Sequence, residues 1–196
     1  MLEFYYGTVN SAKTLTMLAK AHAWKSTGKK VCIVKPAMDT RSAGVSSRVG
    51  LSCDADIVLK SSESLCDYSD TFNASDVVLV DEVQFLTRSQ VLDLRKLTVG
   101  LLDKTTKAIP VQCYGLRTLS DGTLWDSIQV LMAQADAMHE VSTVCAYCSD
   151  HAVFSKSVSQ GEAGVNLSWD GFIPVCAYHF IHDNERAASP RALGDG

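Results

Sequence analysis

The stretch Gly7-Thr-Val-Asn-Ser-Ala-Lys13-Thr14 decides the fold because of what stands on either side of it. Residues 2–6 form a mainly apolar and aromatic run that predicts a buried strand, and apolar residues recur with helical spacing from Thr14 onward. The stretch between them matches G-x-x-x-x-G-K-[ST], except that Ala12 replaces the second glycine. In this pattern the loop N–H groups and the lysine bind phosphate, and the hydroxyl ligates Mg²⁺. The sequence therefore predicts a phosphate-binding loop; an ordinary strand-to-helix turn with an exposed lysine is the alternative.

The rest of the first 140 residues continues the alternation of strands and helices. Residues 30–34 predict a second strand, and residues 77–80 and 108–114 predict two more. A helix capped by Ser89 is expected between them; its apolar positions are Val91, Leu92, Leu94 and Leu97. Residues 1–140 are therefore expected to form an α/β domain of the P-loop (RecA-like) class, a parallel sheet with helices on both faces.

Asp81 and Glu82 follow directly after the apolar run at residues 77–80. Consecutive apolar residues are typical of a parallel strand covered on both faces, so both carboxylates are expected at its carboxyl end. Beside a phosphate loop, one carboxylate can hold Mg²⁺ and the other can accept a proton. A strand that simply meets solvent at two acidic residues is the alternative.

Two segments depart from this alternation. Residues 38–52 are rich in Gly, Ser and Arg, which predicts a functional loop or lid within residues 38–60. Later in the chain, a small second lobe is expected over residues 141–184, with short strands at residues 141–147, 152–158 and 172–176. Residues 185–196 are expected to be a frayed tail.

Three of the seven cysteines fall in this second lobe and are grouped. Cys145 and Cys148 form C-x-x-C, and Cys176 with His179 forms C-x-x-H. Three thiolates and one imidazole complete a tetrahedral Zn²⁺ site with no open position, which indicates a structural site. His182 is the alternative imidazole ligand, and chance placement of cysteines in a β-rich lobe is the alternative to a metal site.

Charge and hydropathy limit the partners of the protein. The 196 residues carry a net charge of −4 without a basic stripe, which argues against binding to nucleic acid or to an anionic membrane. No apolar run approaches the roughly 20 residues of a membrane helix, and the first residues lack the pattern of a signal peptide. A soluble, cytoplasmic protein is therefore expected.

Several motifs occur in the order that one family shows. They are Asn10-Ser-Ala-Lys-Thr14, Lys35-Pro36 with Asp39 and Arg41, Ser46-Ser-Arg-Val-Gly-Leu-Ser52, Val80-Asp-Glu-Val-Gln-Phe-Leu86, Cys113-Tyr-Gly-Leu-Arg-Thr118, and Val175-Cys176 with His179. Together they resemble the type II thymidine kinases, most closely the bacterial branch, almost from end to end. The resemblance implies transfer of the ATP γ-phosphate to the 5′-hydroxyl of thymidine or deoxyuridine. It also implies Mg²⁺ with ATP, a structural Zn²⁺ and a homotetramer.

The resemblance further implies roles for individual residues. Glu82 would be the general base. ATP and Mg²⁺ would be bound by Gly7, Thr8, Asn10, Ser11, Ala12, Lys13, Thr14, Asp39, Arg41, Asp81 and Gln84. The nucleoside would be bound by Val9, Phe85, Leu116, Val165, Leu167 and Phe172, the last three from a lasso loop of the zinc lobe.

The chain departs from the family pattern at a few positions, which include Ala12 and, near the base, Ser120 and the pair Leu167-Ser168. These changes are expected to affect nucleoside affinity and selectivity more than reaction type. Two other functions compete with the kinase. One is a RecA-like ATPase, and the other is a P-loop protein of the same fold that binds nucleotide without turnover.

Overall fold

The computed structural model describes residues 1–38, 44–46, 52–105, 107–157 and 171–188. Within them, six parallel strands form one sheet in the order β5-β2-β6-β7-β1-β8. The strands are β1 (Leu2–Gly7), β2 (Val31–Pro36), β5 (Ile57–Leu59), β6 (Val77–Val80), β7 (Val111–Leu116) and β8 (Ala137–Glu140). The predicted parallel sheet is confirmed. Because the strands are parallel, the ends of β1, β7 and β6 lie next to one another at one edge.

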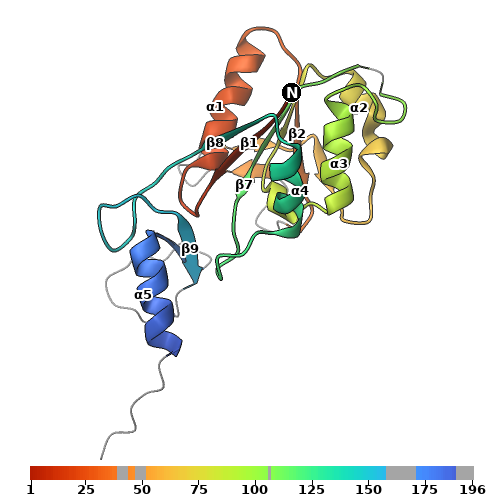
Figure 1. Cartoon of the computed structure of the whole chain (residues 1–196). Helices are drawn as coiled ribbons and strands as arrows, with labels where there is room; N and C mark the ends of the chain where they lie inside the picture. The colour runs from red at the N-terminus through yellow and green to blue at the C-terminus, as the bar shows by residue number, and fades with distance from the viewer. Residues whose placement is uncertain (39–43, 47–51, 106, 158–170, 189–196) are drawn as a thin grey trace, which may run out of the picture.

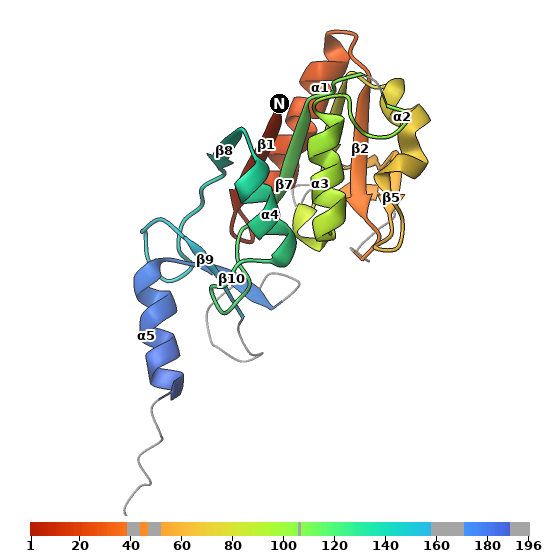
Figure 2. The same cartoon turned by 45° about the vertical axis from the view of Figure 1, so that its right-hand side comes forward.

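Helices cover both faces of the sheet, as the sequence predicts. Side chains alternate along a strand, so Phe4 packs in the core with α3 (Arg88–Leu97) and α4 (Asp126–Gln134), whereas Tyr5 faces α1 (Lys13–Ser26). Figure 2 shows α3 and α4 in front of the sheet and α1 behind it. The short helices η1 (Leu65–Tyr68) and α2 (Ser69–Asn73) pack on the α3 side. Each large apolar side chain buried in this way contributes about 1.5–3 kcal/mol.

The cap of α3 differs from the prediction. Thr87, not Ser89, precedes the helix; its hydroxyl accepts a hydrogen bond from the N–H of Gln90. The side chain of Gln90 in turn accepts from the N–H of Thr87. This reciprocal pair needs a cap three residues before a Gln, a spacing that Thr87 has and Ser89 lacks. The prediction of Ser89 as the cap is therefore wrong.

The segment predicted as a lid contains regular structure. β3 (Gly44–Ser46) and β4 (Ser52–Asp54) pair antiparallel, and Val45 is buried in the core beside α1. β5 pairs with β2 and forms an edge of the central sheet. A strand this short carries almost no periodic signal, which is why the polar sequence around it concealed it. Residues 39–43 and 47–51 of the predicted lid lie outside the described residues.

The last part of the chain forms a small lobe that projects from the sheet (Figure 1). β9 (Phe154–Ser157) pairs antiparallel with β10 (Phe172–Val175), and α5 (Ala177–Ala188) follows. The rings of Phe154 and Phe180 stack 4.2 Å apart and close the lobe's core. The predicted domain boundary near residue 141 stays a proposal.

Two expectations for this lobe are wrong. Residues 141–147 do not form a strand; only an isolated bridge joins Val144 to His151, because the chain turns there to bring Cys145 and Cys148 together. The expected tail also begins too early, since α5 continues through Ala188. Residues 189–196 lie outside the described part. None of the helices described is long and apolar enough to cross a membrane.

Candidate active site and metal centre

The predicted phosphate loop runs from the end of β1 to the start of α1. Its chain reverses through two left-handed residues, Asn10 with φ of 61° and Ala12 with φ of 62°. Asn tolerates this conformation, whereas Ala pays a steric cost in it. Ala12 therefore departs from the pattern in residue type, but its backbone has the left-handed conformation that a glycine would adopt at this position.

Lys13 lies inside the loop and is almost fully buried. Its Nζ donates to the carbonyl oxygen of Thr8 at 2.6 Å and to Ser11 Oγ at 3.2 Å. A fixed cation surrounded by loop backbone is the arrangement that binds an anion such as phosphate.

Asp81 connects the loop to β6. Thr14 Oγ1 lies 3.3 Å from Asp81 Oδ2 and 3.4 Å from Oδ1. Burial raises the pKa of the Asp81 carboxyl, and the charge of Glu82 adds to the rise, while Lys13 and Thr14 act against it. A buried carboxylate with this excess of negative charge favours a nearby cation.

Glu82 follows in a left-handed conformation, with φ of 48° and ψ of 42°. Such backbone conformations cost a non-glycine residue of order 1–3 kcal/mol and are typical of functional sites. The turn puts both acidic residues at the sheet edge, as the sequence led us to expect. Gln84 Nε2 donates to Glu82 Oε2 at 2.5 Å.

The structure describes some of the residues expected to bind the nucleoside. Val9 is in the phosphate loop, Leu116 ends β7, and Phe85 meets the ring of Trp125 edge-on at 5.5 Å. Phe172 begins β10 opposite Ser157. Four of the assigned residues lie outside the described part of the chain: Asp39, Arg41, Val165 and Leu167.

Two contacts between the phosphate loop region and the small lobe were not anticipated from the sequence. Val9 N–H donates to Ser155 Oγ at 3.0 Å, and Ser155 is buried in β9. Arg117 Nη2 donates to the carbonyl oxygen of Val153 at 3.4 Å, while its guanidinium lies over the ring of Tyr6. The only sequence signal for Ser155 is a polar residue inside a strand, which is too common to select it.

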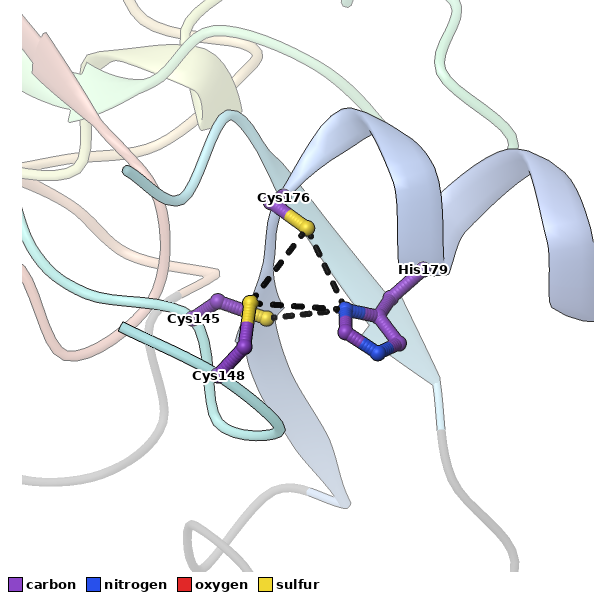
Figure 3. A group of neighbouring side chains, drawn as sticks. All are labelled: Cys145, Cys148, Cys176 and His179. Atoms are coloured by element: carbon purple, nitrogen blue, oxygen red, sulfur yellow. Dashed lines mark hydrogen bonds between the residues drawn. The ribbon is translucent and has the colours of Figure 1, made fainter. Parts of the chain in front are cut away.

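Cys145, Cys148, Cys176 and His179 form one cluster, as predicted (Figure 3). Their ligand atoms all lie within 4.8 Å of one another. His182 stacks on Tyr178 instead, so of the two candidate imidazoles the cluster contains His179.

The spacing of these atoms fits a tetrahedral metal site. With metal–sulfur bonds of about 2.3 Å and metal–nitrogen bonds of about 2.0 Å, tetrahedral ligand atoms lie roughly 3.5–3.8 Å apart. The Sγ atoms of Cys148 and Cys176 are 3.8 Å apart, and His179 Nδ1 lies 3.2–3.7 Å from the three sulfur atoms. Burial raises the pKa of Cys145, but backbone hydrogen bonds at Cys176, Tyr147 and Cys148 lower it more, which favours the ligating thiolate. The cluster could therefore hold a metal ion.

Comparisons with known proteins identify the family of the chain. The chain matches the family model "Thymidine kinase" over residues 1–180. It is 32% identical to the thymidine kinase of Lactobacillus johnsonii, covering 94% of this chain and 98% of that protein. The thymidine kinase of Lactococcus lactis is also 32% identical, with 92% and 96% covered. The thymidine kinase of Xanthomonas axonopodis pv. citri is 40% identical, with 74% and 68% covered.

Likeness to solved structures is weaker. A DNA replication initiation factor covers 71% of this chain, and this chain covers 39% of it, at 16% identity and a TM-score of 0.39, which is too low to add to the argument. The family match, in contrast, extends from the phosphate loop through the acidic end of β6 to the Cys₃His cluster. The chain therefore belongs to the thymidine kinase family.

Proposed function

We propose that this protein is an ATP-dependent kinase that transfers the γ-phosphate to the 5′-hydroxyl of thymidine or deoxyuridine. The contact between Thr14 and Asp81 carries the proposal, because it joins the phosphate loop to the acidic strand end. A hydroxyl and a carboxylate meeting beside a buried lysine are the parts that phosphoryl transfer with Mg²⁺ requires. Family membership supports the same reaction.

The donor side of the reaction is assigned to the loop and β6. ATP and Mg²⁺ are proposed to be bound by Gly7, Thr8, Asn10, Ser11, Ala12, Lys13, Thr14 and Asp81, with Asp39 and Arg41 from the predicted lid. Mg²⁺ would supply charge neutralisation at the phosphates. Lys13 holds its cation within the loop, so it can stabilise phosphate charge without moving far.

Glu82 is proposed to take the proton from the nucleoside 5′-hydroxyl. It needs only to lie within hydrogen-bond reach of that hydroxyl, and its place directly after Asp81, the proposed Mg²⁺ ligand, supports this role. The nucleoside is proposed to lie among Val9, Phe85 and Leu116, covered by Val165, Leu167 and Phe172. The Cys₃His cluster is proposed to hold one structural Zn²⁺, and the protein to be a cytoplasmic homotetramer that binds neither nucleic acid nor membranes.

A turnover assay tests the proposal. The values of kcat/KM are compared for thymidine, deoxyuridine, a bulky 5-substituted deoxyuridine, deoxycytidine and deoxyadenosine, with Mg-ATP saturating. Backbone groups that pair with N3–H and the C4 carbonyl should reject an amino group at C4, since each unpaired buried group costs about 1–3 kcal/mol. The first three substrates should be accepted, the bulky one because Val9 and Ser120 are small. Equal rates with deoxycytidine would refute the acceptor assignment, and no turnover with any substrate would refute the kinase function.

Two substitutions separate donor binding from proton transfer. Lys13→Ala should weaken ATP binding and turnover together, because it removes the cation of the loop. Glu82→Gln keeps size and hydrogen bonding but cannot accept the proton, so kcat should fall while ATP affinity is kept. A Glu82→Gln variant with near wild-type kcat would show that another group is the base.

A further inference from the structure

Gln84 makes three hydrogen bonds, to the acidic pair, to β7 and to α4. It lies in η2 (Val83–Phe85), directly after the acidic pair, and is 3% exposed. Its Nε2 donates to Glu82 Oε2 at 2.5 Å, and its Oε1 accepts from the N–H of Leu116 at 3.0 Å. Its backbone carbonyl accepts from Ser127 Oγ at 2.7 Å. The amide is therefore fixed between the proposed general base and the end of β7.

Gly115 provides the space for this amide. A Cβ atom at Gly115 would lie 2.4 Å from Gln84 Oε1 and 2.8 Å from Val83 Cγ1. Both distances are shorter than real carbon contacts, so an alanine would displace the Gln84 side chain, Val83 or both. The φ of Gly115 is not positive, so the missing side chain, and not the backbone conformation, is what makes glycine necessary here.

We infer that Gln84 is a positioning residue that orients the Glu82 carboxylate, and that Gly115 is required to admit it. The inference rests on the proposed function, because Glu82 is the proposed base. Glu82 follows β6 in a strained turn, where the backbone alone leaves its side chain several rotamers. A charge-assisted hydrogen bond from a buried amide restricts that choice before the nucleoside arrives.

This role differs from the one that the family resemblance implies for Gln84. A ligand of Mg²⁺ or a contact of ATP would use the amide oxygen or a donor facing the loop. Here the oxygen accepts from Leu116 N–H and the nitrogen donates to Glu82, and almost none of the side chain is exposed. The two roles predict different kinetics.

Two substitutions at Gln84 separate the contacts. Gln84→Met keeps the length of the side chain but removes both hydrogen bonds. Gln84→Glu keeps an acceptor for Leu116 N–H but has no donor for Glu82 once it is ionised, which burial beside Glu82 shifts to the alkaline end of a pH profile. Both should lower kcat for thymidine roughly 10- to 100-fold, while KM for Mg-ATP and for thymidine changes less than about threefold.

Gln112→Met is the matched control. It is the same substitution in β7, where Gln112 Nε2 donates to Glu3 on the opposite face of the sheet. It should keep wild-type kcat. Gly115→Ala should reproduce the loss of kcat from the other side of the contact. A third variant, Gln84→Ala, removes the side chain that Gly115→Ala would displace. In the double variant Gln84→Ala/Gly115→Ala, the fold-loss of kcat should therefore be smaller than the product of the losses in the two single variants.

The outcomes are distinguishable. A raised KM for Mg-ATP with unchanged kcat in Gln84→Met would overturn the inference in favour of phosphate or Mg²⁺ binding. Wild-type kcat in Gln84→Glu across the whole pH profile, including its alkaline end, would overturn it in favour of a structural brace for Leu116. If Gln84→Met fails to fold in a thermal melt, Gly115→Ala and the double variant carry the same test. A wild-type protein that phosphorylates no deoxynucleoside would refute the proposed function itself, and the inference with it.

Discussion

Ala12 holds a backbone conformation that glycine adopts freely. The left-handed region costs an L-residue roughly 1–2 kcal/mol, while glycine loses roughly 0.5–1 kcal/mol more on folding. Ala12→Gly should therefore raise the free energy of unfolding by up to about 1 kcal/mol, measured by urea denaturation. The exposed Ala23 in α1 is the control, since Ala23→Gly should lower that free energy by about 1 kcal/mol. Equal losses in both variants would contradict the strain at Ala12.

Asp81 is expected to be required for turnover but to lower the free energy of unfolding of the ligand-free protein. Its pKa is raised in the folded protein, so the folded state binds the proton more tightly than the unfolded state, and stability falls as pH rises from the ordinary carboxyl pKa to the raised one. Asp81→Asn removes this charge and should raise the free energy of unfolding by about 1–2 kcal/mol near pH 8, with little gain near pH 4, close to the ordinary carboxyl pKa. Turnover should be lost. Denaturation at both pH values checks this, and a pH-independent gain would refute the electrostatic cause.

β9 is the element that joins the small lobe to the phosphate loop. Ser155→Ala leaves the partly buried N–H of Val9 without its acceptor, which should cost about 1 kcal/mol of stability and raise KM for thymidine. Ser155→Thr keeps the hydroxyl and should restore both. Ser157, which is exposed at the end of the same strand, is the control: Ser157→Ala should change neither urea denaturation nor KM. Unchanged KM in Ser155→Ala would show that the contact is not part of the nucleoside site.

The strength of the local signal decided which elements the sequence could predict. β1, α1, β2 and β6 carry long apolar runs or clear helical spacing, and all four lie where the sequence placed them. β5 has only three residues, and the start of α5 contains His179, whose C-x-x-H spacing points to an irregular metal-binding lobe more than to a helix. Ser89 lies closer than Thr87 to the first apolar residue of α3, and only the reciprocal pairing of Thr87 with Gln90 identifies Thr87 as the cap. Short elements and caps depend on tertiary partners that a single sequence does not display.

The features of the candidate site also fall into two groups: those that the sequence could predict and those that it could not. The phosphate loop, Asp81-Glu82, and the C-x-x-C and C-x-x-H pairs are each contiguous or closely spaced, so the sequence alone shows their chemistry. The contacts that connect them are not: Val9 and Ser155 are 146 positions apart, and Gln84 meets Leu116 across 32. Gly115 could be noted as part of a motif, but only the fold shows that the Gln84 amide occupies its space.

The small lobe should depend on its metal for its fold. Among the described residues of the lobe, which leave out 158–170, the buried apolar core consists of a few side chains around Phe180, too few to support a lobe of this size alone. We expect one Zn²⁺ per chain by metal analysis. His179→Ala should lose the metal, make the lobe sensitive to protease and raise KM for thymidine, whereas His182→Ala should keep Zn²⁺ and activity. Zinc-free protein with full activity and an intact lobe would contradict this.

The hydrogen bond from Val9 to Ser155 joins the phosphate loop, the proposed ATP site, to the lobe proposed to cover the nucleoside. Any movement of the lobe over a nucleoside carries β9 with it, and so acts on the backbone that would cradle ATP. Binding of the two substrates is then thermodynamically linked, and each must change the affinity of the other by the same factor. A nucleoside analogue that holds the lobe at another angle would therefore change the affinity for ATP without contacting ATP, which makes the lobe an indirect target for selective inhibitors.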